Sequence, residues 1–196
     1  MMRAYTSIQQ LVRLPADRRA SIRLYAGHFP FMVTDMLGGE FITITLLREP
    51  TERILSYLKH AKRYRPEFET KSLEEIYETP SLFSWLVHNY QVKLFAMNPG
   101  DPARTHLYPI DIDRDRLERA KANLERVTSI GLTDRLDELV SELCARYGWR
   151  GAVPRLEVSE AFRPSSALED RIASDNQADI EFYDFAVELY RQRRRT

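Results

Sequence analysis

The chain has 196 residues, of which 43% are hydrophobic and 30% are charged, a size and composition that predict one domain (residues 1–196) with a hydrophobic core. Lysine plus arginine equals aspartate plus glutamate at 29 each, which excludes the strong positive charge of many nucleic-acid-binding proteins. No apolar run is long enough to span a membrane, and the first thirty residues lack the apolar core of a signal peptide. We therefore expect no nucleic-acid partner and no membrane span, and a cytoplasmic location by default.

The first predicted elements are a strand and the helix that follows it. Residues 41–47 are apolar and β-branched without glycine or proline, which predicts a strand buried in a sheet. Pro50 suits the first position of a helix, and Ile54, Leu55 and Leu58 predict its buried face. Arg48 follows the strand at its carboxyl end, where open α/β sheets bind ligands.

This strand–helix junction predicts an anion site. The N–H groups and the dipole at a helix N-terminus attract anions, Arg48 can add a two-pronged hydrogen-bond donor, and Ser56 can add a hydroxyl. The alternative for Arg48 is an ordinary surface ion pair. Four basic residues continue the segment and predict either a solvated helix face or a rim that attracts an anionic ligand: Lys59, Lys62, Arg63 and Arg65.

The remaining sequence predicts mainly helices, so the fold class is a helix-rich α/β fold. We expect helices at residues 72–79, 81–95, 115–127, 133–147 and 167–194, short strands at 106–110 and 127–132, and loops at 98–102 and 151–164. Thr133 suits an N-cap and Gly148 a helix end. Cys144, the one cysteine, predicts a buried, inert thiol, and the arginines at 191 and 193–195 predict a solvated helix end.

Several segments, in order, resemble a known family. Residues 46–57 resemble the 3′-phosphate-binding segment of sulfotransferases that use 3′-phosphoadenosine 5′-phosphosulfate (PAPS): a strand, Arg-Asp-Pro, a further arginine, and Ser-x-Tyr, here with Glu49 in place of the aspartate. Residues 25–31 resemble the Gly-His segment of the carbohydrate sulfotransferase branch that includes heparan sulfate 2-O-sulfotransferases, and residues 89–95 resemble its Asn-x-Gln helix. Residues 117–136 and 175–183 are similar in character to the C-terminal helices of the family.

The resemblance implies a P-loop-like parallel sheet flanked by helices, with PAPS as donor, PAP as product and no metal. It places Arg48 and Ser56 on the 3′-phosphate of the donor and implies His28 as the base that accepts a proton from the acceptor hydroxyl, which would belong to a carbohydrate. Histidine suits this task because it titrates near neutral pH. The alternative for His28 is a structural histidine near Pro30, and Asn89 and Gln91 are expected either at the ligand or on a helix surface.

The family's N-terminal strand and its phosphate loop, Pro-Lys-x-Gly-Thr-[Ser/Thr], have no counterpart, since the first lysine is Lys59. Relative to the family the chain is therefore expected to be N-terminally truncated, with half of a donor site. Three interpretations stay open: a sulfotransferase (EC 2.8.2.-) that needs the loop for activity, a non-catalytic nucleotide-binding or protein-interaction module, and a scaffold that shares only ancestry. An uncovered sheet edge also predicts a possible homo-oligomer or strand exchange.

Overall fold

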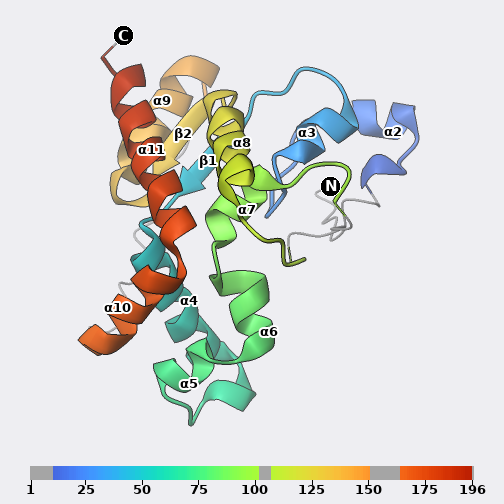
Figure 1. Ribbon diagram of the computed structural model, residues 1–196. Coiled ribbons are helices and arrows are strands. Elements are labelled where there is room, and N and C mark those ends of the chain that lie inside the picture. Colours follow the sequence, from blue (N-terminus) through green and yellow to red (C-terminus); the bar gives the residue numbers. More distant parts are fainter. Residues whose placement is uncertain (1–10, 102–106, 151–163, 196) are drawn as a thin grey trace.

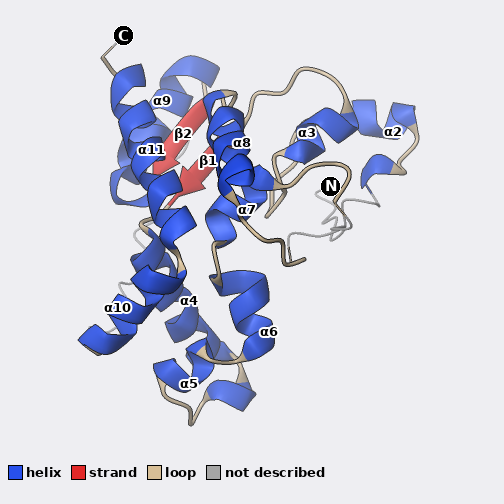
Figure 2. Ribbon diagram, viewed as in Figure 1, coloured by secondary structure: helices blue, strands red, loops and turns tan. Residues whose placement is uncertain are grey.

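The computed structural model describes residues 11–101, 107–150 and 164–195. Figures 1 and 2 show helices arranged around a small sheet of two strands. The helices are α2 (Ala16–Ala20), α3 (Met32–Leu37), α4 (Pro50–Tyr64), α5 (Leu73–Tyr77), α6 (Pro80–Leu82), α7 (Tyr90–Ala96), α8 (Arg114–Glu125), α9 (Leu136–Tyr147), α10 (Ser166–Asp175) and α11 (Gln177–Arg193); the strands are β1 (Ile44–Leu47) and β2 (Ser129–Leu132); and short 3-10 or π turns are η1 (Pro66–Phe68), η2 (Phe83–Val87) and η3 (Thr133–Arg135). A helix-rich fold of the general α/β type is thereby confirmed.

The two strands run parallel, with Ile44 opposite Ser129 and Leu47 opposite Leu132. All four residues of β2 are buried, which confirms the second predicted strand. One face of the sheet packs against α7, α8 and α11 in a hydrophobic core that contains Leu47, Ile130, Leu132, Val92, Phe95, Leu117, Leu124, Phe182 and Tyr190.

The prediction of a buried strand at residues 41–47 is wrong in its burial and in its length. Regular pairing covers only β1, and the side chains of Ile42, Ile44 and Leu46 are 62%, 38% and 47% exposed. On this face α9 covers β2, where Leu139 lies against Gly131, but β1 stays uncovered. Apolar, β-branched sequence therefore indicated a strand correctly, while the layers around it depend on neighbours that the local sequence cannot show.

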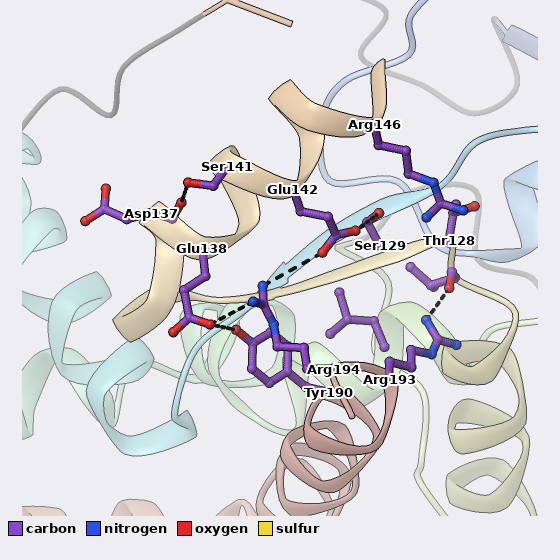
Figure 3. A pocket seen from close by; sticks show the side chains of 12 residues that line it. Thr128, Ser129, Asp137, Glu138, Ser141, Glu142, Arg146, Tyr190, Arg193 and Arg194 are labelled. Carbon is purple, nitrogen blue, oxygen red and sulfur yellow. Dashed lines mark hydrogen bonds and ion pairs between the residues drawn. The ribbon is translucent and has the colours of Figure 1, made fainter. Parts of the chain in front are cut away.

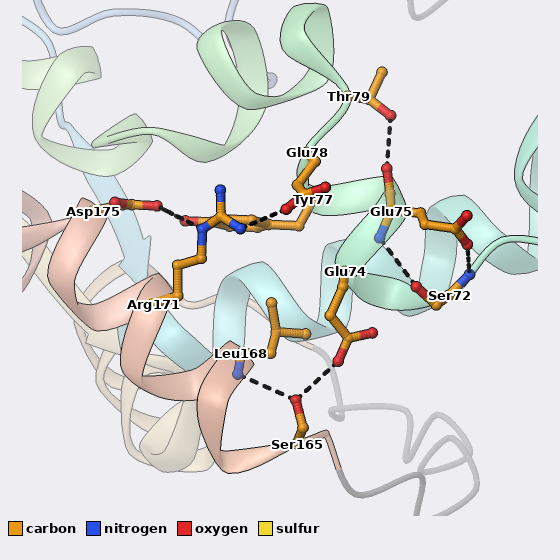
Figure 4. A network of polar contacts seen from close by, with 10 residues as sticks. All are labelled: Ser72, Glu74, Glu75, Tyr77, Glu78, Thr79, Ser165, Leu168, Arg171 and Asp175. Carbon is orange, nitrogen blue, oxygen red and sulfur yellow. Dashed lines mark hydrogen bonds and ion pairs between the residues drawn. The ribbon is translucent and has the colours of Figure 1, made fainter.

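A second hydrophobic core joins α4 to α5, α6 and α10. Ile54, Leu55 and Leu58 are buried in it, as predicted from the helical spacing. Polar contacts between α5 and α10 lie beside this core (Figure 4): the Ser165 hydroxyl donates to Glu74 at 2.9 Å, Arg171 pairs with Glu78 at 2.6 Å, and the Tyr77 hydroxyl donates to Asp175 at 3.0 Å.

Two predicted long helices are each interrupted at an asparagine. The segment 81–95 breaks at Asn89, which has left-handed backbone angles (φ 46°), and the segment 167–194 breaks at Asn176 between α10 and α11. The two breaks contact each other, because the Asn89 N–H donates to the Asn176 side-chain oxygen at 2.8 Å. The spacing of apolar residues predicted continuous helices, because a hydrogen bond between residues so far apart in the chain cannot be recognised from local sequence.

Smaller predictions had mixed outcomes. Gly148 ends α9 with φ 66°, as expected, and α8 begins one residue before its predicted range of 115–127 and ends at Glu125. Thr133 is not the N-cap of α9, because its hydroxyl donates to the Leu47 carbonyl at 3.0 Å and the helix begins only at Leu136. Residues 107–110 form no strand, and Cys144 is half-buried rather than buried. His106 and residues 151–163 of the predicted loop lie outside the described residues.

Candidate functional site

The junction between β1 and α4 is closed by a carboxylate of the chain itself. Pro50 occupies the first helical position, as predicted. Glu49 is the N-cap, and its side chain accepts hydrogen bonds from Thr51 N at 3.1 Å and Glu52 N at 2.7 Å. The prediction that free N–H groups here would bind an anion is therefore wrong for Thr51 and Glu52, since a capping carboxylate already satisfies both donors.

Arg48 lies at the carboxyl end of β1, as predicted, and its backbone is fixed by Gln91 of α7. The Arg48 N–H donates to the Gln91 side-chain oxygen at 3.0 Å, and the Gln91 side-chain nitrogen donates to the Arg48 carbonyl at 2.8 Å. Gln91 is buried, which excludes the helix-surface interpretation for it. A side-chain amide that bonds both groups of one residue leaves that backbone little freedom, so the start of the Arg48 side chain is held in place.

The hydrogen-bond donors of the Arg48 side chain are not all satisfied by the described residues. Its Nε is buried and has no hydrogen-bond partner among the described residues, while Glu52 lies 3.6 Å away as an ion pair. The two side chains are 37% and 65% exposed, and exposed pairs of this kind contribute little to stability. The surface ion pair expected as the alternative is thus present.

Ser56 is exposed on α4. It follows Glu52 by four residues, so the two lie on the same face of the helix. Glu52 also forms the ion pair with Arg48, so Ser56 lies one helical turn beyond the ion-pair partner of Arg48. The two predicted phosphate ligands are thus related through Glu52.

His28 is exposed, and its ring meets Tyr90 edge to face with centroids 6.3 Å apart. Tyr90 begins α7, and its ring carries the guanidinium of Arg53 and the ammonium of Lys93, each 5.0 Å from the ring centroid. His28 is therefore linked to α4 through Tyr90 and Arg53. His28 lies in the loop before α3, whereas Arg48 follows β1 and Ser56 lies on α4, so these ring contacts are what connects the predicted base to the elements of the predicted phosphate ligands.

A cluster of buried charges supports this region. Lys93 is 1% exposed and donates to the Trp85 carbonyl at 2.7 Å, and burial lowers the pKa of Lys93 to about 8. Arg53 donates to the carbonyls of Leu86 and Val87 at 3.1 Å each. Asp179 of α11 is fully buried, and burial raises the pKa of Asp179 although it accepts N–H bonds from α7.

Two further polar atoms of this cluster, Arg53 Nε and the Tyr57 hydroxyl, are buried without a hydrogen-bond partner among the described residues. Burial raises the pKa of Tyr57, which keeps its hydroxyl protonated and able to donate. Sequence reasoning did not assign Lys93 or Asp179. Adjacent residues of a helix do not share a face, and lysine is rarely buried, so Val92 and Leu94 on either side of Lys93 gave no signal of its burial.

The four basic residues after Ser56 line one cavity of about 770 Å³ at the end of α4, together with Glu69 and Glu74. Lys62 already has one hydrogen-bond partner, since its ammonium donates to the Lys71 carbonyl. These residues thus face a common cavity, the arrangement that the rim interpretation requires. Arg48, Ser56 and His28 do not line this cavity.

A second cavity of about 980 Å³ lies at the start of β2, at the end of the sheet opposite Arg48 (Figure 3). The end of α11 is exposed, as predicted, but Arg193 and Arg194 also line this cavity and have partners within the chain. Arg193 donates to the Val127 carbonyl at 2.6 Å, and Arg194 pairs with Glu138 at 2.9 Å. The Ser129 hydroxyl donates to Glu142 at 2.7 Å, so the polar groups of this cavity largely satisfy one another.

Within the described ranges, no group of three or more histidine, cysteine, aspartate or glutamate side chains could hold a metal ion. No helix in the same ranges is long and apolar enough to cross a membrane. The chain matches no family model, no curated protein and no solved structure. The geometry of the site and the resemblance of its motifs to those of sulfotransferases are therefore the basis for proposing a function.

Proposed function

We propose that this chain binds the 3′-phosphate of an adenosine nucleotide at the β1–α4 junction and acts as a sulfotransferase-type domain. The donor is PAPS, and the acceptor is a hydroxyl group, with a carbohydrate as the class that the motif resemblance suggests. The observation that carries the proposal is Arg48: Gln91 fixes its backbone, and its guanidinium, on a side chain that is 37% exposed, has no hydrogen-bond acceptor among the described residues beyond the ion pair with Glu52 at 3.6 Å. A phosphate would satisfy this donor with a charge-assisted hydrogen bond.

In this proposal each residue has a defined task. Arg48 and Ser56 hold the 3′-phosphate. The oxygen of the acceptor hydroxyl attacks the sulfur of the donor, and His28 accepts the proton of that hydroxyl. The bond between sulfur and the bridging phosphate oxygen then breaks, and PAP leaves with both electrons of that bond. The fold would be P-loop-like around this junction, and the phosphate loop that binds the 5′-phosphosulfate, which the sequence lacks, would have to be supplied for transfer.

A second candidate is a non-catalytic nucleotide-binding or protein-interaction module. Glu49 favours it, because its carboxylate occupies two helix N–H groups and adds negative charge beside Arg48. Both candidates include the same 3′-phosphate contact, so nucleotide binding is the first property to test. Transfer activity separates them afterwards.

The test is calorimetric titration with adenosine 3′,5′-bisphosphate, with 5′-AMP as the ligand control. Arg48→Ala is compared with Arg119→Ala, an exposed arginine on α8 away from the junction. Hydrogen bonds to charged groups contribute about 1.5–3 kcal/mol, so we expect Arg48→Ala to weaken binding at least tenfold. Arg119→Ala should bind as the unaltered chain does. Equal affinity for 5′-AMP, or an unchanged affinity of Arg48→Ala, would contradict the proposed site.

A further inference from the structure

The outer face of β1 carries an exposed apolar row. Side chains of a strand alternate between faces, so Ile42, Ile44 and Leu46 share one face. They are 62%, 38% and 47% exposed, although Ile44 and Leu46 belong to a parallel sheet, a type whose faces are normally covered. Glu40 precedes the row and Arg48 follows it, both at even-numbered positions of the sequence.

Among the described residues, no further strand pairs with the backbone edge beside this row. The odd-numbered residues bond to β2 and its flanks: Thr43 O accepts from Ser129 N at 3.0 Å, and Leu47 O accepts from the Thr133 hydroxyl at 3.0 Å. The N–H and C=O groups of the even-numbered residues therefore point away from β2. Those of Arg48 are taken by Gln91, which closes the edge at that end. The open stretch is thus Ile42, Ile44 and Leu46.

This stretch is complementary to itself when it is reversed. With Ile44 opposite Ile44 of the partner subunit, an antiparallel pairing places Ile42 opposite Leu46 of the partner subunit. The same register brings Glu40 opposite Arg48 of the partner subunit at each end. Opposed residues in an antiparallel pair lie on one face, so the apolar residues would contact each other across the dimer axis and opposite charges would flank them.

We propose that this chain forms a homodimer by antiparallel pairing of β1 with β1 of a second copy. The result is a continuous four-stranded sheet in the order β2-β1-β1-β2. A register shift of two residues in either direction removes at least one apolar pair and separates the charges, which favours the pairing centred on Ile44. A second copy fits better than an unrelated strand because its charges match at both ends. Glu40 is exposed and has no ion-pair partner among the described residues, so in the nucleotide-free chain it is available for Arg48 of the partner subunit, which has only the 3.6 Å ion pair with Glu52 in its own subunit.

Sedimentation equilibrium over a range of concentrations, without nucleotide, tests the dimer independently of the proposed nucleotide site. Ile44→Lys places two lysines opposite each other at the dimer axis, and like charges so placed cost several kcal/mol, so the dissociation constant should rise at least tenfold. The matched control is Tyr108→Lys, because Tyr108 is 43% exposed and is not part of β1. The control should dimerise as the unaltered chain does.

Charge exchange tests the register. Glu40→Arg and Arg48→Glu should each weaken the dimer, and the double variant should restore it, since each change alone creates like-charged pairs and both together recreate opposite ones. Circular dichroism confirms that each variant is folded. A monomer at every concentration, equal weakening by Ile44→Lys and Tyr108→Lys, or a double variant weaker than both single variants would overturn the proposal.

Discussion

Lys93 offers the sharpest test of the buried charge cluster. Its side chain is 1% exposed, donates to the Trp85 carbonyl at 2.7 Å, and has a pKa lowered from 10.5 to about 8, mainly by burial. The neighbouring charges are Asp179, which opposes this shift, and Arg53, which adds to it. Because the folded pKa lies below the unfolded one, the unfolded chain binds the proton more tightly between pH 8 and 10.5.

The free energy of unfolding should therefore rise with pH in this window. One pKa unit corresponds to about 1.4 kcal/mol, so the full shift corresponds to about 3 kcal/mol. The Lys93 contribution is complete above pH 10.5 and is lost as the pH falls through about 8. The perturbation is Lys93→Met, which keeps an unbranched side chain but cannot titrate.

Urea denaturation of both proteins from pH 7 to 10.5 measures this effect as a difference. Subtraction removes the titration of groups that both proteins share, such as Tyr90, whose pKa burial raises to about 12. We expect the unaltered chain to gain up to about 3 kcal/mol relative to Lys93→Met over this range. A difference that stays constant with pH, or that falls, would refute the buried charged state of Lys93.

Two stability predictions concern packing and hydrogen bonding. Asn176→Ala removes the acceptor of the Asn89 N–H and should lower the free energy of unfolding, measured by urea denaturation, by about 2–3 kcal/mol. Gln177→Ala, at the exposed neighbouring position, should change the free energy of unfolding little, and equal effects of the two variants would contradict the role of Asn176. Gly131→Ala places a Cβ 2.4 Å from Leu139 Cδ2 and should cost about 1–3 kcal/mol, and Leu139→Ala in the same chain should remove most of that additional cost; an undisturbed Gly131→Ala would show that α9 packs differently on β2.

Sequence reasoning succeeded where the information is local. Pro50 and the apolar spacing after it predicted α4, and four apolar or small residues predicted the buried β2. It failed where a residue's state depends on distant partners. At the breaks, the Asn176 side chain accepts a hydrogen bond from the Asn89 N–H, and the Asn89 side chain accepts one from the Asp179 N–H of α11. Neither asparagine interrupts the apolar spacing, which therefore predicted continuous helices.

At the candidate site, too, the sequence predicted some features and missed others. The position of Arg48 at the end of a strand followed from its place between an apolar run and a proline. The capping by Glu49 was not foreseen, although a carboxylate at this position is a common N-cap partner. The exposure of β1 was not foreseen either, because a run of apolar, β-branched residues has the same pattern whether helices cover it or another chain does.

The C-terminal helices are part of the candidate site, although they lie far from it in the sequence. Arg48 is held by the Gln91 side chain, and the Gln91 backbone N–H donates to Asp179 at 3.2 Å. The Asp179 N–H donates to the Asn89 side chain at 3.0 Å, and the Asn89 N–H donates to Asn176 at 2.8 Å. Each bond orients the next donor, so the joint between α10 and α11 fixes the start of α7, and α7 fixes the residue proposed to bind phosphate. Buried polar groups are hydrogen-bonded in folds of every function, but if Arg48 binds phosphate as proposed, these bonds also hold its backbone in place before the anion arrives.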